Sequence, residues 1–291
     1  PTDYTIVVDS SQSMRGHRYE RATRLVREVV GSLDRRHRVT VLRCDLDCAS
    51  LGALRAPSAA LANEAVALLE HTVPAGSSNI VKALRTAIDG FGTDNRPRAI
   101  IYVGDGQSTS GPTRIASIAA ELEALTSRGV HVSTVGVGQD ADTRVLGTIA
   151  RIGGGQFVPF VPGETVRLAA LRVLETTYGS GLVDPVLELP SGLEAVAPSA
   201  LPNLRAGQEI VVTARMRGPV TGEARLSGKV AGRPFERRYP LNLTASTSAG
   251  NAFVPRVWAE NRIADLDESD APSAQSEKVA LSVAFGVMTR E

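Results

Sequence analysis

Three oxygen-bearing side chains near the N-terminus fall on alternate residues, as Asp9, Ser11 and Ser13. In an extended segment that begins to turn, this spacing can aim all three side chains at one point. Carboxylate and hydroxyl oxygens suit a hard cation such as Mg2+, whereas zinc would normally recruit His or Cys. The motif alone is a weak signal, because aspartate and serine are also common in turns and at helix N-caps.

The position of this motif strengthens the interpretation. It directly follows the apolar run 4–8, and Asp105, which precedes Gly106, directly follows a second apolar run at 99–103. A loop at 74–78, rich in Pro, Gly and Ser, precedes a helical pattern. In open α/β sheets, ligands bind outside the carboxyl ends of the strands. We therefore expect these three loops to meet at one edge of a sheet.

The elements that must position these loops alternate through residue 177. Apolar residues in the segment 22–33 recur at spacings of three and four, which is typical of an amphipathic helix. Strands are expected at 4–8, 38–44, 99–103, 131–137 and near 157, with a further short strand at 51–54. Helices are expected at 22–33, 59–71, 80–91, 115–125, 145–152 and 164–176. This alternation predicts an α/β fold with a Rossmann-like, doubly wound and mostly parallel sheet.

The pattern changes after residue 182. Short β-prone stretches punctuated by Gly and Pro predict a smaller β-sandwich-like domain, with strands at 186–189, 209–216 and 224–230. A helix is expected at 254–266, with Trp258 as its anchor on the β-rich part, followed by a polar loop at 267–276 and an apolar segment at 279–287. The expected domains are 1–177, 178–253 and 254–291.

Composition limits the classes of function. The chain has 291 residues, of which 43% are hydrophobic, enough for one or two cores. Its 32 basic and 31 acidic residues leave a formal net charge of +1, which gives no electrostatic reason to expect nucleic acid as a partner. No apolar run approaches the roughly 18 residues that a membrane span needs. We expect an excised or processed piece, because the sequence starts at Pro1 without a signal-peptide pattern.

The two cysteines, Cys44 and Cys48, cannot form a zinc site by themselves. A local disulfide can form if the chain turns between them, and it would indicate an oxidising compartment. Two buried free thiols are the alternative, and the sequence leaves both open.

Together these motifs closely resemble the von Willebrand factor A family over about residues 3–177. The metal-ion-dependent adhesion site of that family has an Asp-x-Ser-x-Ser loop, a threonine in a Gly-Gly-Thr-Asn-Ile loop, and an aspartate followed by glycine. The resemblance implies that the metal ligands here are Asp9, Ser11, Ser13, Ser78 and Asp105. Two positions depart from the pattern: Ser78 replaces the threonine and retains its hydroxyl, and Ser77 replaces a glycine.

A second resemblance covers the remainder of the chain. The β-rich part, with the segments 257–266 and 284–289, is similar to inter-alpha-trypsin inhibitor heavy chains and their bacterial relatives. Those proteins place another β-rich domain before the von Willebrand factor A domain, so such a domain would be missing here and would be a candidate partner. The resemblance also implies a location at the cell surface, in the periplasm or outside the cell.

The resemblance implies a non-enzymatic module for protein–protein interaction or adhesion. Bound Mg2+, with Mn2+ or Ca2+ as alternatives, would be bridged to an acidic residue of a protein partner. The alternative hypothesis is a structural scaffold with a vestigial metal site. A metal-assisted hydrolase would need a general base and a substrate cleft, and the sequence indicates neither, so no catalytic residue is assigned.

Overall fold

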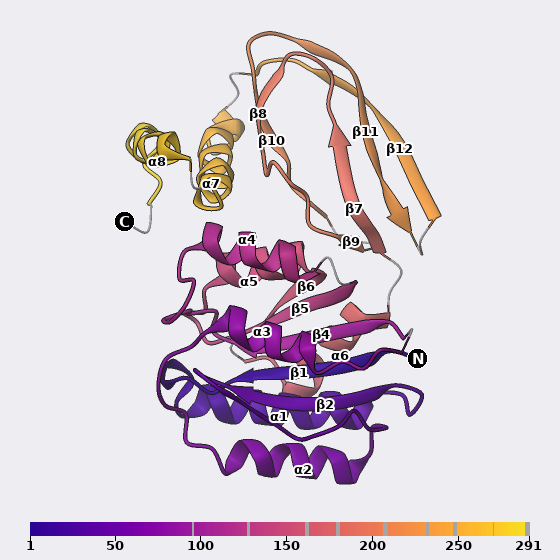
Figure 1. Ribbon diagram of the computed structural model, residues 1–291. Coiled ribbons are helices and arrows are strands. Elements are labelled where there is room, and N and C mark those ends of the chain that lie inside the picture. The colour runs from indigo at the N-terminus through magenta and orange to yellow at the C-terminus, as the bar shows by residue number, and fades with distance from the viewer. Residues whose placement is uncertain are drawn as a thin grey trace. The chain divides into compact units, whose positions relative to one another are not determined.

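The computed structural model describes residues 1–94, 96–126, 129–160, 163–178, 181–205, 209–230, 233–246, 249–269 and 271–288 (Figure 1). The chain forms two compact units, Pro1–Gly179 and Ser180–Glu291, called unit 1 and unit 2 below. Each unit has its own sheets, helices and buried apolar residues.

Unit 1 is built on a six-stranded sheet. Its strands lie in the order β3 (Cys48–Ser50), β2 (Arg38–Cys44), β1 (Asp3–Asp9), β4 (Arg98–Gly104), β5 (Val130–Val137) and β6 (Gly154–Phe160). Neighbouring strands are parallel except that β3 runs antiparallel to β2. The order reverses between β1 and β4, which makes the carboxyl ends of these two strands the topological switch point where ligands bind in such sheets.

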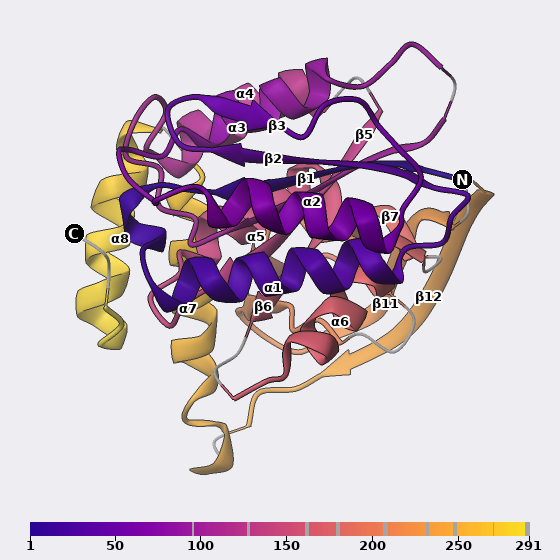
Figure 2. The same cartoon turned by 90° about the horizontal axis from the view of Figure 1, so that it is seen from below.

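Helices cover both faces of this sheet (Figures 1 and 2). One face is covered by α1 (His17–Ser32), α2 (Ala59–Glu70) and α6 (Val166–Tyr178). The other is covered by α3 (Ile80–Asp89), α4 (Ile115–Thr126) and α5 (Thr143–Ile152). The short 3-10 helix η1 (Gln12–Met14) lies between β1 and α1.

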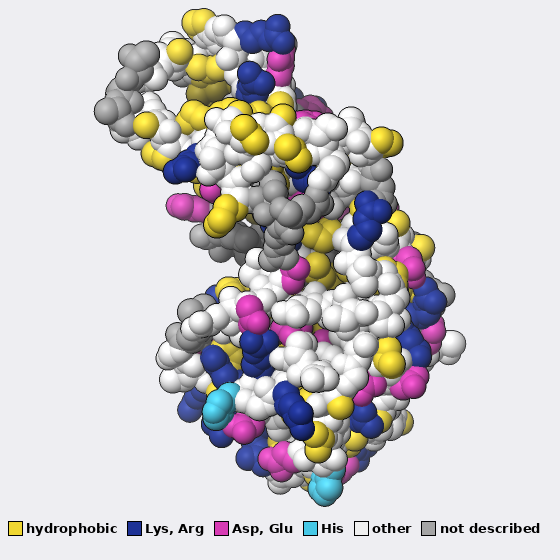
Figure 3. Space-filling model, turned by 90° about the vertical axis from the view of Figure 1, so that its left-hand side faces the viewer, with side chains coloured by type: hydrophobic (Ala, Val, Ile, Leu, Met, Phe, Trp, Pro, Cys, Tyr) yellow, Lys and Arg dark blue, Asp and Glu magenta, His cyan; other side chains and the backbone are white. Residues whose placement is uncertain are grey.

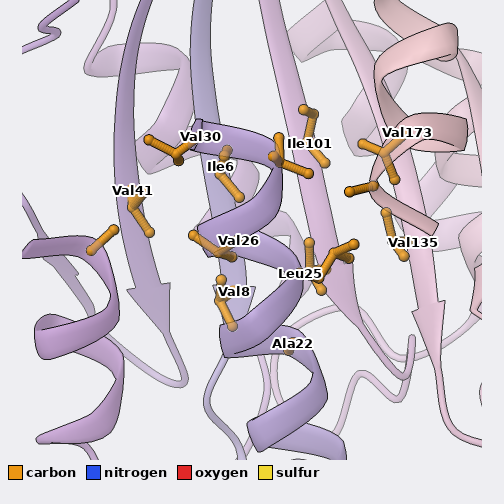
Figure 4. Packing of buried hydrophobic residues seen from close by; sticks show 14 of the residues in the cluster. Ile6, Val8, Ala22, Leu25, Val26, Val30, Val41, Ile101, Val135 and Val173 are labelled. Carbon is orange, nitrogen blue, oxygen red and sulfur yellow. The ribbon is translucent and has the colours of Figure 1, made fainter. Parts of the chain in front are cut away.

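Strand β1 is buried on both faces of the sheet, which is why its sequence is a nearly continuous apolar run. All seven of its residues are buried, because successive side chains point to opposite faces and both faces are covered by helices. Ile6 and Val8 pack with Leu25 and Val26 of α1 (Figure 4), whereas Val7 belongs to the apolar cluster on the other face. The strand that carries Asp9 is therefore held from both sides.

The expected order of strands and helices in unit 1 is present, with one correction. The short strand expected at 51–54 lies instead at Cys48–Ser50, and beyond it the structure has a single bridge between Val39 and Arg55. The Cys44–Cys48 pair closes the turn immediately after β2, so the returning strand begins earlier than the apolar residues suggest.

Unit 2 contains two small antiparallel sheets. The four-stranded sheet has the order β12 (Arg233–Leu243), β11 (Val220–Val230), β7 (Gly181–Glu188) and β9 (Leu204–Arg205). The second sheet pairs β10 (Thr213–Met216) with β8 (Leu193–Ala197). The 3-10 helix η2 (Ala249–Asn251) and the helices α7 (Val254–Asp267) and α8 (Pro272–Phe285) follow. In the described part of the chain, no helix has the length and apolar character that a membrane crossing requires.

The two C-terminal helices of unit 2 pack on each other. Trp258 of α7 is buried, its ring lies 5.6 Å from that of Phe285, and its Nε1 donates a hydrogen bond of 2.8 Å to the carbonyl of Ala195 in β8. Trp258 thus anchors α7 to the sheet, as expected. The polar loop expected at 267–276 is wrong in its second half, because α8 begins at Pro272. Proline suits the first turn of a helix, and the polar residues of that turn lie on the exposed face.

Candidate metal centre

The carboxylate of Asp9 connects three segments of unit 1. Asp9 ends β1 and is 1% exposed. Its Oδ1 accepts a hydrogen bond of 2.8 Å from the backbone N–H of Ser11. Its Oδ2 accepts hydrogen bonds from the Ser78 hydroxyl at 3.0 Å and from the Tyr102 hydroxyl at 2.9 Å. The first loop (residues 10–16), the second loop (71–79) and strand β4 therefore meet at one buried carboxylate.

In the first loop, Ser11 and Ser13 lie side by side. Ser11 has an extended backbone (φ −68°, ψ 167°), and Ser13 lies in the 3-10 helix η1, so the segment begins to turn between them as predicted. Their Oγ atoms are 3.1 Å apart. Ser11 is buried and Ser13 is partly exposed, which places one hydroxyl near the surface.

The second loop is fixed by its neighbours on both sides. The buried Ser78 donates its backbone N–H to Thr109 Oγ1 at 2.9 Å, and its carbonyl accepts hydrogen bonds from the N–H groups of Thr109 and Ser110. The N–H of Ala75 donates to the carbonyl of Ser10 in the first loop at 3.0 Å. The second loop is thus held by the first loop through Ala75 and by the third loop (residues 105–114) through the backbone of Ser78.

Asp105 opens the third loop and is completely buried. Its Oδ1 accepts a hydrogen bond of 3.0 Å from the N–H of Gln107. Its Oδ2 is buried without a hydrogen-bond partner, and the Arg18 Nη1 lies 3.7 Å from it. Because a buried carboxylate oxygen is costly unless it is paired, this atom has unused capacity to bind a cation.

Gly104 allows β4 to approach β1 closely at the point where both strands end. A Cβ atom at this position would lie 2.8 Å from Asp9 Cβ and 2.8 Å from the Tyr102 hydroxyl oxygen, which is closer than real Cβ atoms come. Any larger residue would push the strand ends apart. Glycine at position 104 therefore helps to bring the carboxylates of Asp9 and Asp105 near each other.

The electrostatics of the site follow from this crowding. Burial raises the pKa of the Asp9 carboxyl, and the negative charge of Asp105 raises it further, against the hydrogen bonds from Ser11 and Tyr102. Burial, together with Asp9 and Asp105, holds the pKa of the Tyr102 hydroxyl well above its usual value, so Tyr102 stays protonated and donates. The charge of Asp105 thus opposes the ionisation of Asp9, and a divalent cation would relieve that repulsion.

The five residues predicted as ligands therefore lie in one region. Hydrogen bonds link Asp9, Ser11 and Ser78, Ser13 is joined to Ser11, and Asp105 is close enough for its charge to act on Asp9. Sequence reasoning missed Tyr102, although a lone hydroxyl in an otherwise aliphatic strand was a usable signal. It also missed Arg18, which no feature of the sequence separates from the other arginines of α1.

The donor set decides which ions fit. Within the described residues, no group of three or more His, Cys, Asp or Glu side chains could hold a metal ion. A metal at this site would rely on the hydroxyls of Ser11, Ser13 and Ser78 beside the carboxylates of Asp9 and Asp105. All of these donors are hard oxygens, which suits Mg2+, Mn2+ or Ca2+ better than zinc.

A disulfide between Cys44 and Cys48 lies beside the site. The carbonyl of Cys44 accepts a hydrogen bond of 2.7 Å from the N–H of Ser10, and the carbonyl of Asp45 accepts one of 3.3 Å from the N–H of Asn79. Of the two alternatives that the sequence leaves open, the structure has the disulfide, and the turn that it closes contacts both the first and the second loop.

The rim of the site carries both signs of charge. Figure 3 looks at the side of Figure 1 on which β1 ends, and over unit 1 it shows basic side chains next to acidic ones. Arg15 and Asp140 lie in the surrounding loops and are exposed, and Arg144, at the start of α5, is partly exposed. A partner at this face would therefore meet charged side chains of both signs around the buried carboxylates.

Comparison with known proteins gives a consistent result. A family model described as the von Willebrand factor type A domain matches residues 3–170. The von Willebrand factor A domain-containing protein 5A of Rattus norvegicus is 25% identical over 227 residues, which cover 74% of this chain and 27% of that protein. The protein of the same name from Mus musculus is 26% identical over 177 residues, covering 57% and 22%. The chain thus spans about a quarter of the length of these relatives.

Solved structures share the fold. The von Willebrand factor type A protein from Catenulispora acidiphila has a TM-score of 0.56 at 14% identity, over 98% of this chain and 80% of that one. An aerotolerance-related membrane protein from Bacteroides fragilis has a TM-score of 0.51 at 18% identity, over 60% of this chain and 98% of that one. At these identities the likeness supports the α/β fold and nothing more specific.

Proposed function

This chain belongs to the von Willebrand factor type A domain family, and on that basis we propose that it is a divalent-cation-dependent protein–protein interaction module. The predicted fold class and the resemblance to this family are both confirmed. Domains of this family often mediate metal-dependent protein interactions and are generally not enzymes. The proposal is that this chain likewise acts by binding.

The observation that carries the proposal is the buried Oδ2 of Asp105, which has no hydrogen-bond partner and belongs to a carboxylate that repels the buried Asp9. The proposed ligands of Mg2+, or of Mn2+ or Ca2+, are Asp9, Ser11, Ser13, Ser78 and Asp105. Two carboxylates and three hydroxyls do not complete a cation's shell by themselves. When bound, the cation would supply positive charge and an open coordination position for a carboxylate.

The partner in this proposal is a protein that offers an acidic residue. A carboxylate fits because two arginines at the rim, the exposed Arg15 and the partly exposed Arg144, add positive charge around the centre. The Cys44–Cys48 disulfide supports a site of action in an oxidising compartment, because cytosolic thiols are normally kept reduced. We therefore place the module at the cell surface, in the periplasm or outside the cell.

Calorimetric titration tests the proposal. Mg2+, Mn2+ and Ca2+ are each titrated into chelator-treated wild-type protein, and into the Ser78→Ala and Ser77→Ala variants after circular dichroism has shown that both are folded. We expect saturable binding of one ion by the wild type, a loss of roughly tenfold or more in affinity for Ser78→Ala, and little change for Ser77→Ala. Ser77 is the matched control because it is the adjacent serine in the same loop.

The same variants test the interaction itself. A partner captured in Mg2+ should be released by a chelator and should not be captured by Ser78→Ala. If wild-type protein binds none of the three cations, the cation-dependent function is rejected, and the structural-scaffold alternative takes its place.

A further inference from the structure

The guanidinium of Arg18 lies among three loops at the candidate metal centre. Its Nη1 donates a hydrogen bond of 3.1 Å to the carbonyl of Ser13 in the first loop. The same Nη1 is 3.7 Å from the buried Oδ2 of Asp105 in the third loop. Its Nη2 forms an ion pair of 2.6 Å with Asp140, in the loop 138–142 between β5 and α5. The Arg18 side chain is 31% exposed, so one edge of the group remains at the surface.

The loop between β5 and α5 has room for this side chain because it contains Gly138. Its φ of +111° lies in a region that favours glycine, and a Cβ there would lie 3.1 Å from Arg18 Nε and 3.4 Å from Arg18 Cδ. A side chain at position 138 would therefore crowd the guanidinium. Gly138 and Asp140 together hold Arg18 in one place, next to the metal loops.

The charges at this point make Arg18 a competitor of any bound cation. Asp105 is completely buried, and Arg18 is the basic side chain that forms an ion pair with it among the described residues. Without a cation, the guanidinium partly compensates the buried negative charge. When a divalent cation binds the Asp105 carboxylate, the cation and the Arg18 guanidinium lie close together. Their repulsion lowers the affinity of the site for the cation.

We propose that Arg18 is a built-in counter-ion of the metal centre, which supports the Asp105 carboxylate in the cation-free protein and lowers the affinity for the free cation. This inference rests on the proposed function. A partner's carboxylate would be attracted by both positive groups, so it would favour the cation-bound protein. Cation and partner would then each raise the affinity for the other.

The test compares Arg18→Gln with two other variants. Arg18→Lys keeps the positive charge, and Arg27→Gln removes an exposed arginine later in the same helix. Two quantities are measured for each protein: the Kd for Mg2+ by calorimetry, and the Tm in chelator and in saturating Mg2+. The second readout does not depend on any partner.

We expect Arg18→Gln to bind Mg2+ more tightly than the wild type, on the order of fivefold, because a partly screened positive charge is removed. Its Tm should fall below that of the wild type in chelator, and this difference should shrink in saturating Mg2+, since the cation replaces the lost counter-ion. Arg18→Lys and Arg27→Gln should both keep the wild-type affinity within about twofold.

Two other outcomes overturn the inference in distinguishable ways. In the first outcome, the wild type binds Mg2+, and Arg18→Gln binds it equally or more weakly. The Tm of Arg18→Gln also falls by the same amount with and without Mg2+. Arg18 would then only stabilise the loops, with no effect on cation affinity. If the wild type itself binds no cation, the proposed function fails, and the inference about Arg18 fails with it.

Discussion

The hydroxyl of Tyr102 helps to stabilise the buried carboxylate of Asp9. Both residues are 1% exposed, and a buried charge is costly unless hydrogen bonds compensate it. Tyr102 donates one of the bonds that Asp9 receives, from a side chain that belongs to the apolar cluster on the other face of the sheet. The donor is therefore held by packing.

Replacing Tyr102 by Phe should destabilise the cation-free protein by about 1–3 kcal/mol, because it removes a hydrogen bond to a charged group and keeps most of the ring contacts. Urea unfolding in chelator measures the change. Tyr239→Phe serves as the control, since Tyr239 is 43% exposed and lies in unit 2. Equal losses of stability in the two variants, or none in either, would contradict the role assigned to Tyr102.

Among the site residues, the two carboxylates could be predicted because each adjoins the end of a strand. Asp9 and Asp105 each follow an apolar strand, and the pairing of β1 with β4 brings them together. Arg18 was not predictable in this way, because its contact with Asp105 joins the start of one helix to the loop after another strand. Such a contact depends on the positions of both elements in space, which a local pattern does not contain.

The hairpin formed by β2 and β3 supports two of the metal loops. Cys44 and Cys48 face each other across this antiparallel pair and form the disulfide. Lys82 of α3 donates a hydrogen bond of 2.7 Å to the carbonyl of Leu46 in the turn. With the bonds from Ser10 and Asn79, the turn is held by the first loop, the second loop and α3.

Reduction of this disulfide should lower the stability of unit 1 by about 2 kcal/mol, because closing a short loop restricts the unfolded chain by that amount. It should also weaken Mg2+ binding several-fold, since the turn contacts the loops that carry Ser11 and Ser78. Thermal unfolding and calorimetry with and without a reductant measure both effects. The double variant Cys44→Ala, Cys48→Ala should not respond to the reductant. A wild-type protein that is equally indifferent would refute the prediction.

The helices and strands that could be predicted are those with a buried face, because burial gives their sequence a regular apolar pattern. The helices of unit 1 and its parallel strands have apolar periods of their own, so each was expected near its observed position. Strand β12 has no such period, because most of its residues are exposed and its length comes from continuous pairing with β11. Helix α8 has a weak apolar pattern, and its polar first turns resemble a loop in the sequence.

For the molecule as a whole, the proposed function belongs to unit 1. Every proposed ligand lies there, between two apolar clusters that fix the sheet from both sides. Unit 2 has a separate cluster around Trp258, formed by α7 and α8. The division into three domains at residues 177 and 253 remains a prediction, whereas the chain groups into two compact units. A cation should therefore bind at one place in the molecule, in unit 1.

Crystals of the full chain soaked in Mn2+ would locate the cation, because Mn2+ scatters anomalously and can replace Mg2+ at oxygen sites. We expect one strong anomalous peak, bounded by oxygen atoms of Ser11, Ser13, Ser78, Asp9 and Asp105, which disappears in crystals of the Ser78→Ala variant. A peak at any other group of side chains, or no peak at the five residues in crystals where they are open to solvent, would contradict it.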